Sequence, residues 1–242
     1  MPPEFRYLDP DRLAAVDAAA FARVRPYPWL ALPGLITESG YRELLANLPP
    51  LDLFERKFGY RRRAGQAPHD RYSLEYTPDT PVAAPWRAFI EELRSPAYRR
   101  QIMRIFGVRR PSFRFHWHYT PSGCSVSPHC DARREYGSHL FYFNDADDWR
   151  PEWGGSTLIL DDGGRLSCDS APALEDFAGL EEAPSIGNQS TLIRRTDRAW
   201  HAVRPIDCPE DRLRRVFIVV IHPDTLYWRA RDRLIGKRVQ RL

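Results

Sequence analysis

Hydrophobic residues in the first half of the chain recur at helical spacing. From Asp9 to Arg25 they lie three or four positions apart, and Asp9 and Pro10 suit an N-cap and the first helical turn. The same spacing returns over residues 37–48 and over residues 85–106, where a central proline interrupts it. The first half of the chain is therefore predicted to be mainly helical.

The pattern changes to strict alternation from Pro111 onward. Short runs rich in β-branched and aromatic residues, separated by turn residues, cover positions 113–120, 139–144, 156–160, 190–194 and 216–222. Residues 54–81 have no clear period and are interpreted as loop or irregular strand, and the acidic stretch 161–187 is interpreted as a long loop. Short alternating strands joined by polar turns favour an antiparallel sandwich or jelly roll.

These patterns predict one mostly β domain with supporting helices (α+β) over residues 1–242. A mainly helical region (1–110) would support a double-stranded, cupin-like jelly-roll core (111–225), and a basic segment (226–242) would end the chain. The longest apolar run, Val216 to Ile221, has six residues. It is far shorter than the roughly 20 residues that a membrane-spanning helix needs, so no membrane protein is expected.

Charge and cysteine content narrow the function classes further. The formal net charge is +4, but the basic residues are almost all arginines scattered among acidic ones, which does not indicate a nucleic-acid-binding face. The four cysteines form no CxxC pair, so neither a disulfide framework nor a zinc site is expected. The first residues show no secretory signal pattern, and the expected compartment is a reducing cytoplasm.

Candidate chemistry is concentrated in the segment Ser127 to Asp131. His129 and Asp131 are two residues apart, and on an extended strand such residues point to the same face. His201, just before the last apolar strand, is the best candidate for a third ligand. Two histidines and one carboxylate form the facial triad that suits non-haem Fe(II). The alternative interpretation is a histidine hydrogen-bonded to a nearby aspartate.

An arginine supports the metal interpretation. Arg214 follows His201 by 13 residues and stands at the entrance to a buried apolar strand. A buried guanidinium is costly unless a carboxylate meets it, and its planar fork can bind the far end of a dicarboxylate. Arg212 lies on the same strand face and remains an alternative, whereas Arg215 lies on the other face.

The second half of the chain resembles the prolyl-hydroxylase-type branch of the 2-oxoglutarate- and Fe(II)-dependent dioxygenases. The matching segments are Tyr119–Asp131 (YTPSGCSVSPHCD), Leu140–Asn144 (LFYFN), Trp153–Leu160 (WGGSTLIL) and His201–Pro205 (HAVRP). The resemblance implies a double-stranded β-helix and a hydroxylase that consumes 2-oxoglutarate and O2 and releases succinate and CO2. Ascorbate is a further reductant that it allows.

The resemblance also implies roles for individual residues. His129, Asp131 and His201 would hold iron. Arg214 would bind the far carboxylate of 2-oxoglutarate, and Tyr142 and Tyr119 would belong to the same cofactor site. The family has a serine where this chain has valine two residues after Arg214, which removes one expected hydroxyl contact. Tyr142 and Tyr119 could instead be core aromatic residues.

The substrate is less well defined by the sequence. A prolyl or other protein residue and an amino-acid-like metabolite are the main candidates. A nucleic-acid demethylase using the same cofactors and a non-catalytic cupin-like metal-binding module are the alternatives. Arg133, Arg134 and Arg204 follow the ligands and would form a cationic rim, unless they are ordinary surface residues. Residues 69–76 and 145–153 are candidate substrate loops, and His69, His139 and His222 are not expected to be ligands.

Overall fold

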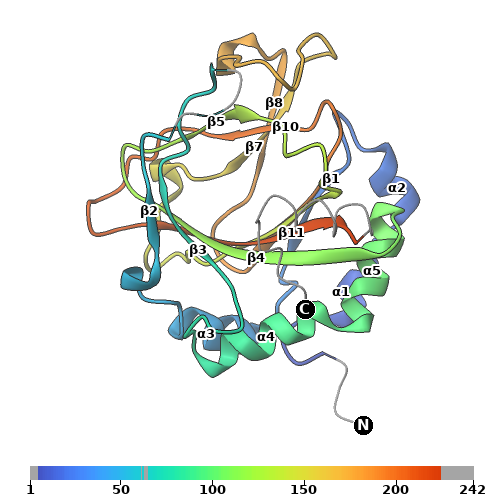
Figure 1. Cartoon of the computed structure of the whole chain (residues 1–242), viewed down its shortest axis with the longest axis vertical. Coiled ribbons are helices and arrows are strands. Elements are labelled where there is room, and N and C mark those ends of the chain that lie inside the picture. The colour runs from blue at the N-terminus through green and yellow to red at the C-terminus, as the bar shows by residue number, and fades with distance from the viewer. Residues whose placement is uncertain (1–4, 61, 63–64, 225–242) are drawn as a thin grey trace, which may run out of the picture.

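The computed structural model describes residues 5–60, 62 and 65–224 (Figure 1). The basic segment expected at 226–242 lies outside the described residues. The described part forms the strands β1 (Trp29–Pro33), β2 (Glu55–Lys57), β3 (Arg71–Glu75), β4 (Pro111–Thr120), β5 (Val126–His129), β6 (Gly137–Tyr142), β7 (Thr157–Asp161), β8 (Gly179–Ala183), β9 (Gln189–Arg194), β10 (Trp200–Val203) and β11 (Arg214–Pro223).

The helices are α1 (Pro10–Ala14), α2 (Ala18–Arg23), α3 (Glu38–Ala46), α4 (Ala84–Arg94) and α5 (Pro96–Phe106). The single helix expected over residues 9–25 is divided in two, because the side chain of Asp17 accepts hydrogen bonds from the first backbone N–H groups of α2 and caps a new helix. The break expected at Ser95-Pro96 is confirmed. Ser95 ends α4, and its hydroxyl accepts a hydrogen bond from the Tyr98 N–H at the start of α5.

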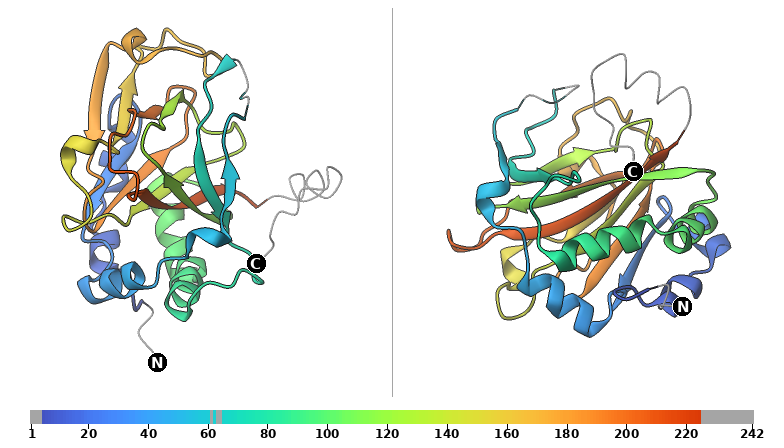
Figure 2. Two further views of the ribbon diagram at one scale, coloured as in Figure 1. Left: turned by 90° about the vertical axis from the view of Figure 1, so that its left-hand side faces the viewer. Right: turned by 60° about the horizontal axis from the view of Figure 1, so that its bottom comes forward.

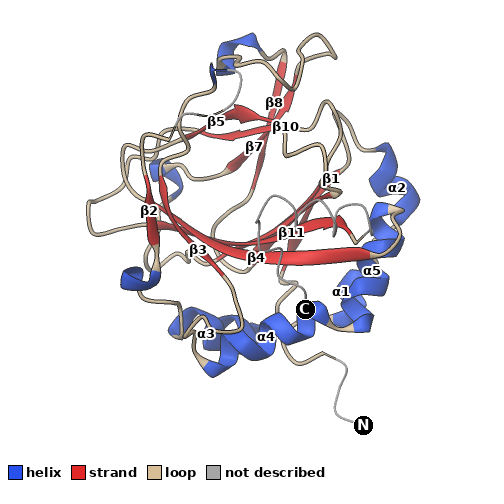
Figure 3. Ribbon diagram, viewed as in Figure 1, coloured by secondary structure: helices blue, strands red, loops and turns tan. Residues whose placement is uncertain are grey.

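The strands form two antiparallel sheets, coloured red in Figure 3. The large sheet has the order β1-β9-β6-β11-β4-β3-β2, and the small sheet has the order β5-β10-β7-β8. The helices α3, α4 and α5 lie against the outer face of the large sheet, on the side away from the small sheet (Figures 1 and 2). The expected mostly β fold with N-terminal supporting helices is confirmed.

Alternate side chains of β4 point in opposite directions, one set into the apolar core beside the helices and the other into the space between the two sheets. The core cluster that contains the buried residues of the helices also contains four aromatic residues of β4: Phe113, Phe115, Trp117 and Tyr119. The ring of Trp86 from α4 lies 5.1 Å from that of Trp117 and 5.0 Å from that of Phe217 in β11. The intervening polar residues of β4 therefore face the space between the two sheets.

Several strands fall where the sequence pattern is weak. The hairpin β2–β3 lies within the stretch interpreted as loop or irregular strand, and β8 lies within the acidic stretch interpreted as a loop. β1 was not expected either, although it pairs with β9 over its whole length. These strands are short, and β1, β2 and β8 lie at sheet edges with few buried side chains, so their sequences lack the alternation that marks β4 and β11.

The sequence predicted no disulfide framework, but the described part of the structure does contain a disulfide. Cys130 and Cys168 are joined by a disulfide with their Cα atoms 5.6 Å apart. The bond ties the segment that carries His129 and Asp131 to the long connection between β7 and β8. A reducing compartment was expected partly because the cysteines indicated no disulfide framework. The Cys130–Cys168 bond removes that argument for a reducing compartment. No helix in the described part of the chain is long and apolar enough to span a membrane.

Candidate metal and cofactor site

The backbone brings the three candidate metal ligands together. His129 ends β5 and lies directly opposite His201 of β10 in the antiparallel pairing of these strands. Asp131 follows two residues after His129, where the chain leaves the strand. The ligand atoms of His129, Asp131 and His201 all lie within 4.8 Å of one another. The cluster that the sequence pattern predicted is therefore present in the fold.

The distances fit one ion shared by three side chains. Asp131 Oδ1 lies 3.5 Å from His201 Nε2 and 3.9 Å from His129 Nε2. The centroids of the two imidazole rings are 4.2 Å apart. All three side chains are largely shielded from solvent. A metal held here would be in a protected position.

Hydrogen bonds orient both imidazole rings. His129 Nδ1 lies 3.0 Å from the carbonyl oxygen of Ser127, and His201 Nδ1 lies 3.0 Å from that of Ala199. An Nδ1–H group that donates to a carbonyl leaves the Nε2 lone pair for a metal. Burial, together with the neighbouring His201, lowers the pKa of His129 well below its ordinary value, which keeps the imidazole neutral and able to coordinate.

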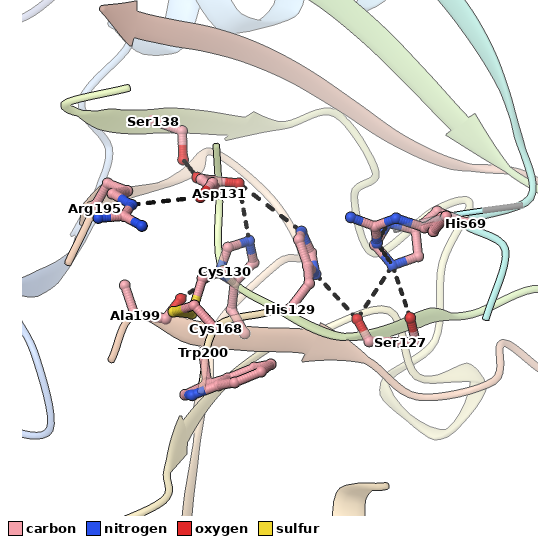
Figure 4. Close-up of polar contacts among 12 residues, drawn as sticks. His69, Ser127, His129, Cys130, Asp131, Ser138, Cys168, Arg195, Ala199 and Trp200 are labelled. Atoms are coloured by element: carbon pink, nitrogen blue, oxygen red, sulfur yellow. Dashed lines mark hydrogen bonds and ion pairs between the residues drawn. A yellow bond between two sulfur atoms is a disulfide. The ribbon is translucent and has the colours of Figure 1, made fainter. Parts of the chain in front are cut away.

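The carboxylate of Asp131 is also held in place. Ser138 of β6 donates a hydrogen bond from its hydroxyl to Asp131 Oδ2 over 3.3 Å (Figure 4). Oδ1 is then the oxygen that faces the two histidines. The donor set of two neutral imidazoles and one carboxylate fits an open non-haem iron site, because it occupies only three of six positions.

The cluster borders a cavity of about 630 Å³ between the two sheets. Both sheets contribute to its wall, with Thr157, His201 and Val203 from the small sheet and Val216 and Ile218 from the large one. This volume is within the usual range for small-molecule sites.

Arg214 lines the same cavity from the first position of β11. Its side chain is buried, and no carboxylate in the described part of the chain forms an ion pair with it. Its Nε donates to the carbonyl oxygen of Gly155 over 2.5 Å, and its Nη2 donates to Thr157 Oγ1 over 3.2 Å. Burial lowers its pKa, as expected for a cation without an anionic partner. A dicarboxylate would supply that partner.

Gly155 makes this contact possible. Its φ of +95° lies in the region that favours glycine, and a Cβ atom there would meet Arg214 Cδ at 3.2 Å. A larger residue would therefore displace the guanidinium. A Gly-Gly pair such as Gly154-Gly155 is typical of a turn, and the structure adds the close approach to Arg214.

Tyr142 and Arg214 are both hydrogen-bonded to the hydroxyl of Thr157. The Tyr142 OH lies 2.8 Å from Thr157 Oγ1, which also accepts from Arg214. The Arg214 guanidinium carbon lies 5.7 Å from the centroid of the Tyr142 ring. Thr157 is therefore the link between the two expected cofactor residues, and the sequence did not identify it. Its position two residues after the Gly154-Gly155 pair was its only signal in the sequence.

Tyr119 does not join the expected cofactor site. Its side chain packs in the core on the outer face of β4, stacked on Phe54 at 4.3 Å, with its hydroxyl directed to the carbonyl of Pro49. The physical reason is strand parity. In the pairing of β4 with β11, Tyr119 is opposite Arg215, and the neighbouring Thr120 is opposite Arg214. This placement corrects the role expected for Tyr119.

The other arginines near the last strand point elsewhere. Arg212 is half-exposed and lies 3.5 Å from Asp211, and Arg215 pairs with Asp148. Of the expected cationic rim, Arg133 pairs with Asp169 at 2.6 Å and Arg204 lies 3.8 Å from Glu182. Arg133, Arg134 and Arg204 are not among the residues that line the cavity. The rim is therefore not formed as expected.

The remaining histidines have structural surroundings. His139 is fully buried and lies 2.9 Å from the hydroxyl of Tyr98, and His222 contacts Ser112. His69 is closer to the site than expected, because its ring centroid lies 4.5 Å from that of His129. Its Nε2 lies 3.0 Å from Ser127 Oγ (Figure 4). It does not belong to the group of side chains that converge on one metal position.

Comparison with known proteins places the fold. No family model and no curated protein matches the sequence. Among solved structures, a prolyl-4-hydroxylase from Pseudomonas putida aligns with a TM-score of 0.57 and 15% identity, over 85% of this chain and 98% of that one. A prolyl hydroxylase from Trichoplax adhaerens, in complex with a hypoxia inducible factor peptide fragment, aligns with a TM-score of 0.60 and 15% identity, over 89% and 91%.

A third similar structure has a different activity. It is a non-heme alpha-ketoglutarate-dependent carbocyclase from nogalamycin biosynthesis, with a TM-score of 0.59 and 11% identity over 88% of this chain and 86% of that one. Together these likenesses show that the chain has the jelly-roll fold of the 2-oxoglutarate- and Fe(II)-dependent oxygenases.

Proposed function

We propose that this protein is an Fe(II)- and 2-oxoglutarate-dependent oxygenase that hydroxylates a C–H bond. The observation that carries the proposal is the joint presence of two features in one cavity. One is the cluster of His129, Asp131 and His201, and the other is Arg214, a buried cation that has no carboxylate partner in the described part of the chain. Neither a structural aspartate–histidine pair nor a simple metal-binding module requires the second feature.

The ligand cluster would hold the iron through His129 Nε2, His201 Nε2 and Asp131 Oδ1. When bound, iron supplies a centre at which O2 is activated while 2-oxoglutarate is converted to succinate and CO2. Ser127, Ala199 and Ser138 fix the orientation of the three ligands by hydrogen bonds.

Arg214 and Thr157 would bind the far carboxylate of 2-oxoglutarate. The guanidinium keeps N–H groups available beyond those donated to Gly155 and Thr157. The Tyr142 hydroxyl is hydrogen-bonded to the same Thr157 oxygen, 2.8 Å away. Because these groups are buried, a charged hydrogen bond formed here is not weakened by bulk water.

The proposed substrate is a prolyl or other protein residue, or an amino-acid-like metabolite. The fold similarity to two prolyl hydroxylases supports the first class. The similarity to a carbocyclase shows that the fold also serves small-molecule chemistry in other proteins. The cavity wall of this chain bears on the choice and is considered in the next subsection.

Anaerobic titration tests the cofactor assignment. The full chain is loaded with Fe(II) without oxygen, and 2-oxoglutarate is added. A weak visible charge-transfer band that saturates at one equivalent is expected, followed by succinate release when air is admitted. The Asp131→Ala variant should show neither signal. If the wild-type protein binds Fe(II) but no band appears when 2-oxoglutarate is added, the proposed function is wrong.

A further inference from the structure

The wall of the cavity nearest the β2–β3 hairpin is rich in basic side chains. The cavity-lining residues on this side include Lys57, Arg62, Arg71, Arg114 and three histidines, His69, His116 and His118. Two of the cations have carboxylate partners there. Arg114 Nη2 lies 2.8 Å from Glu75 Oε1, and Lys57 Nζ lies 3.1 Å from Glu55 Oε2.

Arg62 and Arg71 have no such partner. Within the part of the chain that the structure describes, neither forms an ion pair, and each contacts His69 instead. Arg71 donates from Nη1 to the His69 carbonyl over 2.7 Å, and its buried Nε has no hydrogen-bond partner there. Burial lowers the pKa of both guanidinium groups, to about 10 for Arg62. Both cations are therefore half-buried and lack an ion pair in the described part of the chain. Asp70 interacts electrostatically with Arg71 but does not line the cavity.

The acidic residues of the cavity do not supply that compensation. Besides the paired Glu55 and Glu75, the lining holds Asp131, which is one of the candidate metal ligands, and Glu135. The cations with which Glu135 interacts electrostatically are Arg134 and Arg114, not Arg62 or Arg71. The Arg62 and Arg71 side of the cavity is therefore electropositive.

This pair of arginines is distinct from Arg214. In the sheet, Arg214 is opposite Thr120 on β4, and the register of β3 against β4 places Arg71 level with Thr120 from the other side. Arg71 and Arg214 thus lie two strand spacings apart, roughly 10 Å between backbones. Arg62 contacts the ring of His69 and Arg71 donates to the His69 carbonyl, and the His69 ring centroid lies 4.5 Å from that of His129. One anion can therefore bind at Arg214 while another binds at Arg62 and Arg71.

We infer that Arg62 and Arg71 bind an anionic group, a carboxylate or a phosphate, on a small substrate held beside the metal centre. The inference rests on the proposed function and specifies its substrate class, because it favours an acidic metabolite over a neutral prolyl peptide. A guanidinium pair is suited to such groups, which accept several N–H donors at once.

Phosphate binding tests the anion position without requiring turnover. Inorganic phosphate is titrated calorimetrically into the metal-free full chain that carries Arg214→Gln, which removes the other anion site. Adding Arg71→Gln or Arg62→Gln should weaken phosphate binding about tenfold or more. Arg71→Lys should retain most of it. Arg56→Gln is the matched control, because Arg56 lies on the same hairpin with an exposed side chain and is outside the cavity lining.

The affinity for 2-oxoglutarate separates the two anion positions. In the anaerobic Fe(II) protein, Arg71→Gln should leave the 2-oxoglutarate dissociation constant within about twofold of the wild type, whereas Arg214→Gln should raise it strongly. Unchanged phosphate binding in Arg71→Gln, or a loss of 2-oxoglutarate affinity equal to that of Arg214→Gln, would overturn the inference. If no charge-transfer band forms in the wild type, the proposed function fails, and the phosphate titration still decides whether the anion site exists.

The substrate class is tested with matched pairs. Succinate release by the Fe(II) protein is measured with free amino acids and their amides, and with phosphate esters and the parent alcohols. Acids that stimulate more than their neutral counterparts, with the effect lost in Arg71→Gln, support the inference. Equal or greater stimulation by the amides, or stimulation by a neutral proline peptide alone, contradicts it.

Discussion

At the scale of single residues, the orientation of two imidazole rings determines whether the site can hold a metal. Each ring directs Nδ1 to a backbone carbonyl two residues earlier in the chain, at Ser127 and Ala199. The two Nε2 atoms are thereby turned toward Asp131. This local geometry depends on the strands that carry the histidines, so removing one ring should leave the fold in place.

Replacement of His129 tests this point. In His129→Ala, Fe(II) affinity measured by titration should fall at least about 100-fold, because one of three protein ligands is lost and nothing else replaces it. The far-ultraviolet circular dichroism spectrum of the metal-free protein should not change. His222→Ala is the control, since that histidine lies on β11 outside the cavity. Wild-type iron affinity in His129→Ala would contradict the ligand assignment.

Arg214 allows a second test at this scale. Arg214→Gln should raise the 2-oxoglutarate dissociation constant by roughly 30- to 900-fold, which corresponds to the loss of about 2–4 kcal/mol from a charged hydrogen-bonded pair. Arg212→Gln removes the same charge from a half-exposed position outside the cavity lining and should have little effect. If Arg212→Gln has the larger effect, the last strand has been assigned the wrong arginine.

The sequence predicted some of these residues better than others. Three of them, His129, Asp131 and Arg214, could be selected from the sequence. Strand alternation and a charged residue at the start of an apolar strand can both be recognised there. Tyr119 was selected by resemblance, although the alternation of β4 places it with Phe113, Phe115 and Trp117 in the core. Arg62 and Arg71 could not be selected, because the pairing that brings their hairpin beside His129 is not encoded in any local pattern.

At the scale of elements, the cavity depends on the way strands of opposite sheets are held together. β4 and β11 pair along ten residues and form one wall of the cavity. The alternation of these two strands could be recognised in the sequence. The short strands β5 and β10 carry the metal ligands, yet they have only four residues each. Strands of that length have too few positions to show a period, so only their histidines could be identified from the sequence.

The disulfide between Cys130 and Cys168 is a further element-scale constraint. It closes a loop with a sequence separation of 38 residues and holds the β7–β8 connection against the ligand segment. Cys168→Ser should therefore lower the free energy of unfolding by about 2–4 kcal/mol under oxidising conditions, because the unfolded chain gains freedom. Urea denaturation measures this value. Cys124→Ser, at a free cysteine, should leave it nearly unchanged, and equal stabilities of the two variants would argue against the bond.

At the scale of the whole molecule, buried neutral histidines make stability depend on pH. Burial lowers the pKa of His139 from 6.5 to about 3 in the folded protein. The unfolded state therefore binds more protons between these values, and stability is full above about pH 6.5 and declines as the pH falls toward the folded value. His139 alone should cost roughly 2 kcal/mol between about pH 7.5 and pH 5.

Denaturation of the metal-free protein at several pH values checks this expectation. The free energy of unfolding should fall as the pH is lowered through this range. His139→Phe should flatten the dependence, because an aromatic ring of similar size cannot be protonated. A pH profile that is the same in the variant would show that His139 does not contribute.

The central claim is that one cavity holds a metal at the His129, Asp131 and His201 cluster and a 2-oxoglutarate carboxylate at Arg214. A crystal structure of the full chain with Mn(II) in place of Fe(II) and with 2-oxoglutarate tests both parts at once. We expect Mn(II) bound by these three side chains and the far carboxylate of 2-oxoglutarate on Arg214 and Thr157. Metal bound elsewhere, or 2-oxoglutarate seated away from Arg214, would contradict the account.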